Sequence, residues 1–154
     1  MKKNIFKYGT TYIPTTGKVF DQDEIANVIK AARDGWWTEG EFAKTFEKQF
    51  SSYLGVKYVT LVNSGSSANL LALSSLTSDV FGEKALKSKD EVITAACSFP
   101  TTVNPIIQNG LIPVFVDVNP GTNNPTADVI ARAITKKTKA IMIAHALGNP
   151  LPLR

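Results

Sequence analysis

DEVITAACSFPTTVNPIIQNGLIPVFVDV, residues 90–118, is the stretch of sequence that decides the fold. It contains two short apolar runs rich in β-branched residues, 90–95 and 112–118, which predict strands. Between them, residues 101–109 show a helical pattern that ends at Gly110. We expect Pro105 in the first turn of that helix, where its missing N–H costs little. Two strands joined by a helix predict a βαβ unit with parallel strands.

The same alternation continues on both sides of this unit. Upstream, YVTLV (58–62) is a predicted strand, and residues 66–76 are apolar at helical spacing. Downstream, Thr126 caps a predicted helix that runs to Ile134, and residues 139–144 form a further strand pattern. Strands alternating with helices are typical of an α/β fold, in which helices flank a mostly parallel sheet.

The first 54 residues follow a different pattern. A helix is predicted from Asp21, which forms a capping arrangement with Glu24, to the region of Gly35. A second helix is predicted over residues 41–54, where four side chains recur every four positions: Phe42, Phe46, Phe50 and Leu54. We expect this aromatic stripe to pack in a core. The predicted domains are an amino-terminal segment with two helices, residues 1–54, and the first part of an α/β domain, residues 55–154.

The composition is that of an ordinary globular domain: 154 residues, 44% hydrophobic and 19% charged, with a net charge of +4. So modest a charge does not indicate a nucleic-acid partner. The single cysteine, Cys97, excludes a disulfide framework and a four-cysteine metal or iron–sulfur site within this chain. No signal-peptide pattern is present, and no stretch approaches the about 18 apolar residues of a membrane span. We therefore expect a cytoplasmic protein without a membrane or nucleic-acid partner.

The strongest indication of chemistry is NSGSS (63–67), between a predicted strand and a predicted helix. A helix start has unpaired N–H groups and a partial positive charge, which suit a phosphate dianion. Gly65 allows close approach, and Ser66 and Ser67 add hydroxyl donors. An equally good interpretation is that Ser66 only caps the helix. No Walker A or GxGxxG pattern is present, so neither ATP hydrolysis nor dinucleotide binding is indicated.

A second candidate position, Phe99, follows directly after the predicted strand at 90–95. Ligands of open α/β sheets bind at the carboxyl ends of strands, where an aromatic side chain can stack on a flat ring. Taken alone, Phe99 is more typical of a core residue, but a phosphate-binding turn at the preceding strand end supports a binding role. Three other polar residues favour structural roles: Cys97 as a small buried residue, His145 as a satisfied strand-end histidine and Asp117 as an acceptor for loop N–H groups.

Three segments resemble the sugar-nucleotide aminotransferase family of fold-type I pyridoxal phosphate (PLP) enzymes, the DegT/DnrJ/EryC/StrS type. They are VNSGSSANLLAL (62–73), residues 90–118 and TKAIMIAHALGNP (138–150), in the order of the family. GSSANLLALSSL (65–76), FPTTVNPIIQNG (99–110) and AHALGNP (144–150) are most similar to its branch of CDP-4-keto-6-deoxyglucose 3-dehydratases of lipopolysaccharide biosynthesis. The resemblance implies that residues 55–154 are the first part of the PLP-binding α/β large domain.

The resemblance also implies roles for single residues. Gly65, Ser66 and Ser67 match the segment that holds the phosphate of PLP or pyridoxamine phosphate (PMP), and Phe99 matches the aromatic residue that stacks on the pyridine ring. It assigns this chain no catalytic residue and no metal ligand. In the family, the aspartate on the pyridine nitrogen, the lysine or histidine base and the cluster cysteines come later. We therefore expect a truncated amino-terminal fragment that does not run the reaction alone.

Three functions stay open on these grounds. The first is a PLP/PMP-dependent 3-dehydratase that acts on CDP-4-keto-6-deoxyglucose in O-antigen biosynthesis, as a homodimer with a reductase partner and, in the full-length enzyme only, an iron–sulfur cluster. The second is an aminotransferase of the same family that acts on a nucleotide sugar. The residue at the base position separates them, since a lysine indicates transamination and a histidine indicates the dehydratase. The third is a non-catalytic remnant.

Overall fold

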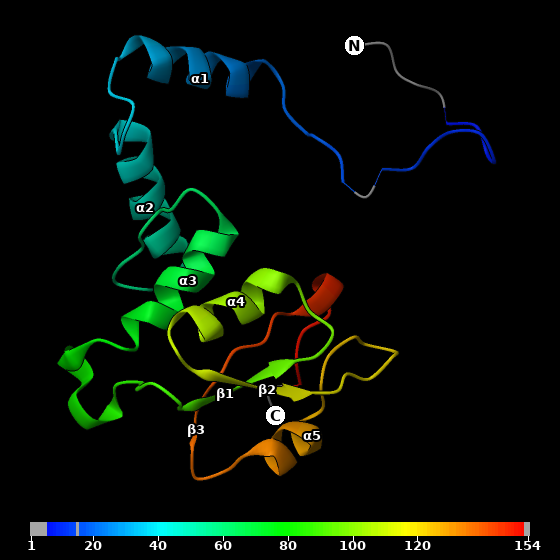
Figure 1. The fold of residues 1–154 in the computed structure, drawn as a ribbon. Coiled ribbons are helices and arrows are strands. Elements are labelled where there is room, and N and C mark those ends of the chain that lie inside the picture. Colours follow the sequence, from blue (N-terminus) through cyan, green and yellow to red (C-terminus); the bar gives the residue numbers. More distant parts are fainter. Residues whose placement is uncertain (1–5, 15, 153–154) are drawn as a thin grey trace. The chain divides into compact units, whose positions relative to one another are not determined.

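The computed structural model describes residues 6–14 and 16–152 of the chain (Figure 1). Its helices are α1 (Gln22–Arg33), α2 (Glu41–Leu54), α3 (Gly65–Ser75), α4 (Pro100–Gln108) and α5 (Ala127–Ala133). Its strands are β1 (Glu91–Ala95), β2 (Ile112–Val116) and β3 (Thr138–Ile141), and two short 3₁₀ turns span Asp79–Lys84 and Ala146–Gly148. The chain separates into two compact units, Met1–Leu61 and Val62–Arg154.

Helix α1 of the amino-terminal unit begins at the capping arrangement that the sequence predicts. The Asp21 carboxylate accepts a hydrogen bond from the Asp23 N–H at 2.9 Å, and the Glu24 carboxylate accepts one from the Asp21 N–H at 2.6 Å. These bonds satisfy N–H groups that a helix start leaves unpaired. The helix ends at Arg33 with Asp34 as its C-cap residue, and Gly35 follows with φ +68°, a conformation that glycine adopts without strain.

The aromatic stripe of helix α2 is formed, but the prediction that it packs in a core is wrong. Phe42, Phe46, Phe50 and Leu54 keep 42, 45, 38 and 51% of their surface exposed. Phe46 and Phe50 stack on each other with ring centroids 5.3 Å apart, and the Lys30 ammonium lies 5.5 Å from the Phe42 ring centroid. Four-residue spacing places side chains on one helix face, but burial also needs a facing layer. The described part of this unit contains no sheet to supply one.

The carboxyl-terminal unit is built on a parallel three-stranded sheet with the order β2-β1-β3. Strand β1 pairs with β2 from Glu91↔Ile112 to Ala95↔Val116, and with β3 from Glu91↔Thr138 onward. Helix α4 packs over one face beside α3, and α5 lies on the opposite face (Figure 1). Since β1 is covered on both faces, only its first residue escapes full burial. The predicted α/β class, with flanking helices and a parallel sheet, is confirmed.

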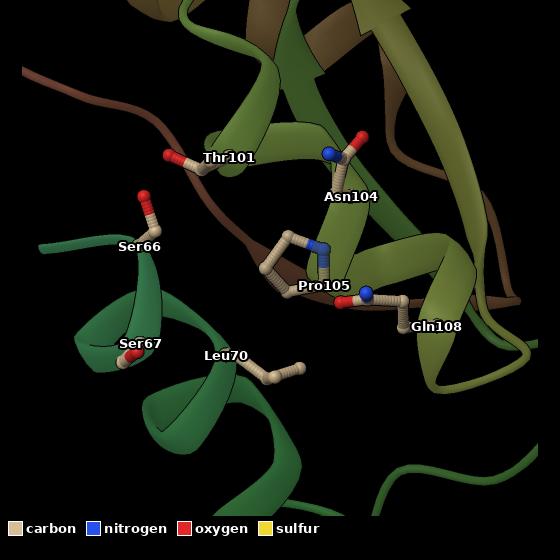
Figure 2. Close-up of a pocket in the computed structure, with 7 residues that line it drawn as sticks. All are labelled: Ser66, Ser67, Leu70, Thr101, Asn104, Pro105 and Gln108. Atoms are coloured by element: carbon tan, nitrogen blue, oxygen red, sulfur yellow. The ribbon is translucent and has the colours of Figure 1, made fainter. Parts of the chain in front are cut away.

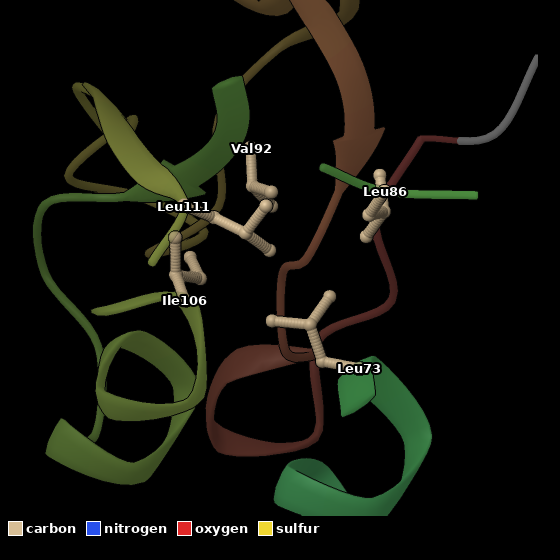
Figure 3. Packing of buried hydrophobic residues seen from close by; sticks show 5 residues of the cluster. All are labelled: Leu73, Leu86, Val92, Ile106 and Leu111. Atoms are coloured by element: carbon tan, nitrogen blue, oxygen red, sulfur yellow. The ribbon is translucent and has the colours of Figure 1, made fainter. Parts of the chain in front are cut away.

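The hydrophobic core of this unit lies between the sheet and the helices α3 and α4. Figure 3 shows its five side chains, which come from both helices, the central strand and two connections: Leu73, Leu86, Val92, Ile106 and Leu111. Burying one aliphatic side chain of this size contributes about 1.5–3 kcal/mol. The cluster therefore fixes α3 and α4 against the same face of the sheet.

The predicted strand at 58–62 is not formed. In the described part of the chain these residues join no ladder, and the Leu61 N–H donates instead to the Glu47 carboxylate at 2.6 Å. A β-branched run favours extended backbone, but a strand also needs a partner for its N–H and C=O groups. The later strands are confirmed, although β2 ends at Val116 and β3 at Ile141, earlier than predicted.

The prediction for Pro105 is also wrong. Helix α4 begins at Pro100, so Pro105 lies inside the helix and not in its first turn. The helix continues through it to Gln108, Asn109 is the C-cap residue, and Gly110 follows with φ +69°. Because proline has no N–H, it leaves the carbonyl four residues earlier, that of Thr101, without its helical donor. The Thr101 carbonyl therefore needs a donor from outside α4.

Other helix boundaries follow the sequence closely. Thr126 is the N-cap residue of α5 as predicted, although its hydroxyl makes no capping hydrogen bond. Gly55 ends α2 with φ +67°. Among residues 6–14 and 16–152, no helix has both the length and the apolar character that crossing a bilayer requires.

Candidate functional site

Helix α3 is capped by Ser64, so the alternative in which Ser66 is the cap is wrong. The Ser64 Oγ accepts from the Ser67 N–H at 3.1 Å, and the Ser64 carbonyl accepts from the Ala68 N–H at 3.0 Å. Gly65, Ser66 and Ser67 are thus the first three residues of the helix. The three predicted phosphate-binding residues share its first turn.

This first turn has hydrogen-bond donors that the protein itself does not use. Within the described chain, the N–H groups of Gly65 and Ser66 and the Ser66 hydroxyl have no hydrogen-bond partner, and both residues are exposed. The Ser67 hydroxyl accepts from the Ser64 Oγ at 3.1 Å and keeps its own proton to donate. Apart from Gly65 itself, its two chain neighbours and the backbone of α3, no atom lies within 4 Å of the place that a Cβ on Gly65 would take. The turn can therefore donate several hydrogen bonds to one anion.

Helices α3 and α4 differ from the other helices in the charge of their first turns. Helices α1, α2 and α5 each carry an acidic residue in the first turn, whereas α3 and α4 carry none. A helix start has a partial charge of about +0.5. In α3 and α4 no carboxylate of the first turn offsets that charge, so both starts favour an anion.

A groove of about 170 Å³ lies between the first half of α3 and helix α4, which lines it from Thr101 to Gln108 (Figure 2). At one end, the hydroxyls of Ser66 and Thr101 point toward the space between the helices, and Leu70 and Pro105 lie further along. The two helices therefore run side by side in the same direction, with their first turns at one end. The Asn69 Nδ2 crosses between them and donates to the Thr101 carbonyl at 3.2 Å.

Phe99 occupies the N-cap position of α4, directly after the connection from β1. Its side chain is 68% exposed, so the alternative interpretation of Phe99 as a core residue is wrong. The Phe99 carbonyl accepts from the Thr102 N–H at 2.9 Å, which holds the residue to the start of the helix. Its ring is accessible at the carboxyl edge of the sheet. Stacking of Phe99 on a cofactor ring stays a prediction.

A buried asparagine joins the two loops that follow β2 and β3. Asn124 is 1% exposed, its Nδ2 donates to the Asn149 carbonyl at 2.9 Å, and its Oδ1 accepts from the Ala146 N–H at 3.3 Å. The Asn149 Nδ2 donates in return to the Thr122 carbonyl at 3.1 Å. The carboxyl ends of parallel strands share one edge of a sheet. These bonds therefore hold two of the loops at the edge where Phe99 follows β1.

The residues expected to be structural have mixed outcomes. The Asp117 carboxylate accepts from the Val118 N–H at 2.8 Å, and the His145 Nδ1 accepts from the Leu151 N–H at 2.9 Å, so both make the predicted local bonds. Cys97 is exposed, and the prediction of a buried cysteine is wrong. The chain has left the sheet at Ala95, and the thiol lies in the connection to α4. In the part of the chain that the structure describes, no cluster of His, Cys, Asp and Glu could hold a metal ion.

Sequence reasoning missed two residues of this region, Asn69 and Thr101. A signal was present, because a proline within a helical pattern frees the carbonyl four residues before it. An asparagine in an otherwise apolar helical run is also expected to have a hydrogen-bond partner. The sequence does not reveal that α3 and α4 lie side by side. Without that knowledge, the Asn69 donor cannot be paired with the Thr101 acceptor.

A parallel sheet with an accessible aromatic ring at its carboxyl edge, together with a helix start that has unpaired donors, places this unit among the α/β folds, in which ligands generally bind at that edge. The chain belongs to the DegT/DnrJ/EryC1/StrS aminotransferase family, whose model matches residues 18–154. The match includes all four candidate site residues, and it confirms the family that the three sequence segments indicate.

Two curated relatives are more than half identical to this chain. The lipopolysaccharide biosynthesis protein RfbH of Salmonella typhimurium is 55% identical over 148 residues, which are 96% of this chain and 34% of RfbH. The dTDP-4-dehydro-2,6-dideoxy-D-glucose 3-dehydratase of Saccharopolyspora spinosa is 54% identical over 145 residues, which are 94% of this chain and 31% of that enzyme. The chain thus spans about a third of the length of these relatives.

A solved structure from E. coli has the same fold. It is the GDP-4-keto-6-deoxy-D-mannose-3-dehydratase with bound hydrated PLP, which is 37% identical with a TM-score of 0.74. The match covers 83% of this chain and 32% of the E. coli chain. It confirms that the α/β unit has the architecture of fold-type I PLP enzymes.

Proposed function

We propose that this chain supplies the cofactor-binding amino-terminal part of a sugar-nucleotide 3-dehydratase that uses PLP or PMP. The substrate we assign is CDP-4-keto-6-deoxyglucose, whose C3 hydroxyl is removed on the way to the dideoxysugars of lipopolysaccharide. The observation that carries this proposal is the 54% identity, over 94% of the chain, to a sugar-nucleotide 3-dehydratase. The lipopolysaccharide biosynthesis protein at 55% identity agrees with it.

The first turn of α3 fits the phosphate of the cofactor. The unpaired N–H groups of Gly65 and Ser66 would donate to phosphate oxygens, and the hydroxyls of Ser66 and Ser67 add two further donors. No acidic residue of the first turn opposes a dianion there. A helix start with free donors is a general anion-binding arrangement, so these three residues are assigned to the phosphate.

The Phe99 ring fits the flat part of the cofactor. It is largely exposed at the start of α4, so a stacked pyridine ring would cover apolar surface that otherwise faces water. An offset aromatic pair adds about 0.5–1.5 kcal/mol beyond the burial itself. Phosphate binding by α3 and stacking on Phe99 would together fix both ends of the cofactor.

The bound cofactor supplies an electron sink, its pyridine ring. The residues of this chain bind its phosphate and orient its ring, whereas the proton must be moved by a positioned base. We assign no residue of this chain to that step, and the 154-residue chain is expected to bind the cofactor without turnover. For the intact dehydratase we propose a cytoplasmic homodimer with a reductase partner and an iron–sulfur cluster.

An aminotransferase that acts on a nucleotide sugar is the second candidate. The family description itself favours it, since the model that matches residues 18–154 is that of an aminotransferase family. Phosphate binding and ring stacking serve both reactions equally. The base differs, because a lysine is expected for transamination and a histidine for dehydration.

The cofactor proposal is tested by titrating the purified chain with PLP and with PMP, and by following the near-ultraviolet absorbance of the cofactor. Gly65→Ala and Phe99→Ala should both weaken binding. Gly65→Ala is informative because its new methyl group meets no atom within 4 Å beyond its chain neighbours and the backbone of α3, so a loss of affinity reports the approach of the ligand. Gly40→Ala at the N-cap of α2 and Phe81→Ala in the 3₁₀ turn are the matched controls. A wild-type chain that binds neither cofactor contradicts the proposal.

The choice of reaction is tested on the gene, by reading the DNA beyond the codon for Arg154. A reading frame, original or shifted, that continues with an aspartate, a histidine at the base position and a set of cysteines supports the dehydratase. A lysine at that position without the cysteines supports the aminotransferase. Unrelated sequence contradicts both and leaves a non-catalytic remnant.

A further inference from the structure

Asn69 connects the two helices whose first turns form the candidate site. It lies one turn after Gly65 on α3, and its Nδ2 donates to the carbonyl oxygen of Thr101 at 3.2 Å. The two residues are 32 positions apart in the chain, so this bond is tertiary. Thr101 lies two residues after Phe99. The bond therefore joins the phosphate-binding end of α3 to the start of the helix that carries the aromatic ring.

The acceptor of this bond is available because of Pro105. In a regular helix the N–H of residue 105 would donate to the Thr101 carbonyl, but proline has no N–H. A carbonyl left without a partner away from water costs about 1–3 kcal/mol. The Asn69 amide removes that cost, and it does so from another helix. A single proline thus turns a local helical bond into a link between two helices.

The hydrogen bond from Asn69 to Thr101 joins the two helices that a bound cofactor would bridge. PLP has its phosphate at one end and its pyridine ring at the other, and the proposed contacts for these ends belong to different helices. Leu70 and Pro105 line the groove further along (Figure 2), but apolar side chains give a helix pair no directional preference. The hydrogen bond is directional and lies in the turn next to the site.

We propose that Asn69 is a positioning residue, which sets the first turn of α3 relative to Phe99 so that one molecule of PLP meets both. This role rests on the proposed cofactor function. Asn69 itself is not assigned a contact with the cofactor. Its contribution is to hold the two half-sites in register before the ligand arrives, which lowers the cost of binding.

The test uses ligands that reach one half-site or both. Inorganic phosphate reaches only α3, pyridoxine offers only a ring, and PLP spans the two. Asn69→Leu removes the donor but keeps a good helix former at an apolar position. We expect Asn69→Leu to weaken the affinity for PLP by about tenfold, the effect of one lost hydrogen bond. The affinities for phosphate and for pyridoxine should change by less than about twofold. Asn104→Leu, on the facing side of the same groove and without a hydrogen bond in the described chain, is the control for each ligand.

A second variant separates positioning from a purely structural role. Pro105→Ala restores an N–H that can satisfy the Thr101 carbonyl within α4. In the double variant Asn69→Leu/Pro105→Ala, thermal stability should recover while PLP affinity stays low, because the link between the helices is still absent. This variant also provides a folded protein if Asn69→Leu alone is too unstable to titrate.

The outcomes are distinct. Equal losses for phosphate and PLP, an unchanged PLP affinity in Asn69→Leu, or a recovered PLP affinity in the double variant would each overturn the positioning role. A wild-type chain that binds phosphate but not PLP overturns the cofactor function, and the role of Asn69 with it. That result comes from the wild-type titration alone, so it is distinguished from a failure of Asn69.

Discussion

Helix α2 of the amino-terminal unit and helix α4 of the carboxyl-terminal unit each have an apolar face, and their side chains differ sharply in burial. Phe46 on α2 keeps 45% of its surface exposed, whereas Ile106 on α4 is completely buried. The difference lies in what faces each helix. Helix α4 packs on the parallel sheet and beside α3, while the described part of the amino-terminal unit contains two helices and no sheet.

The comparison shows that an apolar pattern predicts which face of a helix can be buried. It does not predict whether that face is buried in the folded chain. Burial removes apolar surface from water only when a second layer covers it. The stability of the two units should therefore depend on their side chains to different degrees. Variants of matched residues can measure that difference directly.

The largest effect is expected for Ile106→Ala in the core of the carboxyl-terminal unit. Removing a fully buried isoleucine costs about 2–5 kcal/mol, since it loses transfer energy and leaves a cavity. Urea unfolding of the whole chain, followed by circular dichroism, measures this loss. The neighbouring Ile107 is 59% exposed, and Ile107→Ala should change stability by less than about 1 kcal/mol. Equal losses for the two variants would mean that α4 does not pack on the sheet as described.

A smaller but substantial effect is expected for Asn124→Ala. This change removes the side chain that binds Asn149 and Ala146, and it leaves their backbone groups without those partners. A buried group without a partner costs about 1–3 kcal/mol. The free energy of unfolding should fall by that order, and proteolysis within the loops after β2 and β3 should become faster. Asn104→Ala removes an exposed amide and should change neither the free energy of unfolding nor the rate of proteolysis. If Asn124→Ala also changed neither quantity, the connection between the two loops would be contradicted.

The two helix caps provide an intermediate comparison, because Asp21 and Ser64 perform the same task in different units. Replacing a capping side chain with alanine costs about 1 kcal/mol. Ser64→Ala should speed amide hydrogen exchange in α3 and lower the stability of the sheet that α3 helps to cover. Asp21→Ala should speed exchange in α1 alone. If Asp21→Ala also increased exchange in β1, the two units would be more tightly coupled than the division of the chain into two units indicates.

The smallest effect is expected for Phe46→Ala on the exposed stripe of α2. Its stacking with Phe50, one turn along the same helix, is worth about 0.2–0.5 kcal/mol in such a pair. Helicity of α2 should fall slightly, and the midpoint of urea unfolding should hardly move. Loss of several kcal/mol in the chain alone would show that the stripe is in fact covered.

Much of the fold could be read from the sequence, because its signals are local. The capping arrangement at Asp21, the β-branched runs of β1 and β2 and the glycine after α4 act within a few residues of their own position. The run at 58–62 has the same composition as a strand but finds no partner strand among the described residues, so its composition could not decide its structure. Pro105 was misplaced because the start of α4 depends on Pro100, a better first-turn residue.

In the candidate site, too, some features could be predicted from local sequence and others could not. The glycine and serines at the start of α3 and the aromatic residue after β1 were recognisable, since a helix start provides donors wherever it occurs. The sequence offers Ser66 as a possible cap, as an alternative to phosphate binding, whereas the cap is Ser64, two positions earlier. That Cys97 is exposed follows from the exact end of β1, which sequence patterns define poorly.

By itself, the sequence determined the class of fold, the location of the three strands that form and the family to which the chain belongs. Each rests on residues close together in the chain or on segments that occur in a fixed order. Only the tertiary structure decided which apolar faces are covered and that Asn69 bonds to Thr101, 32 residues away. The physical reason is that burial and long-range hydrogen bonds need two surfaces to meet, and a linear pattern describes one surface at a time.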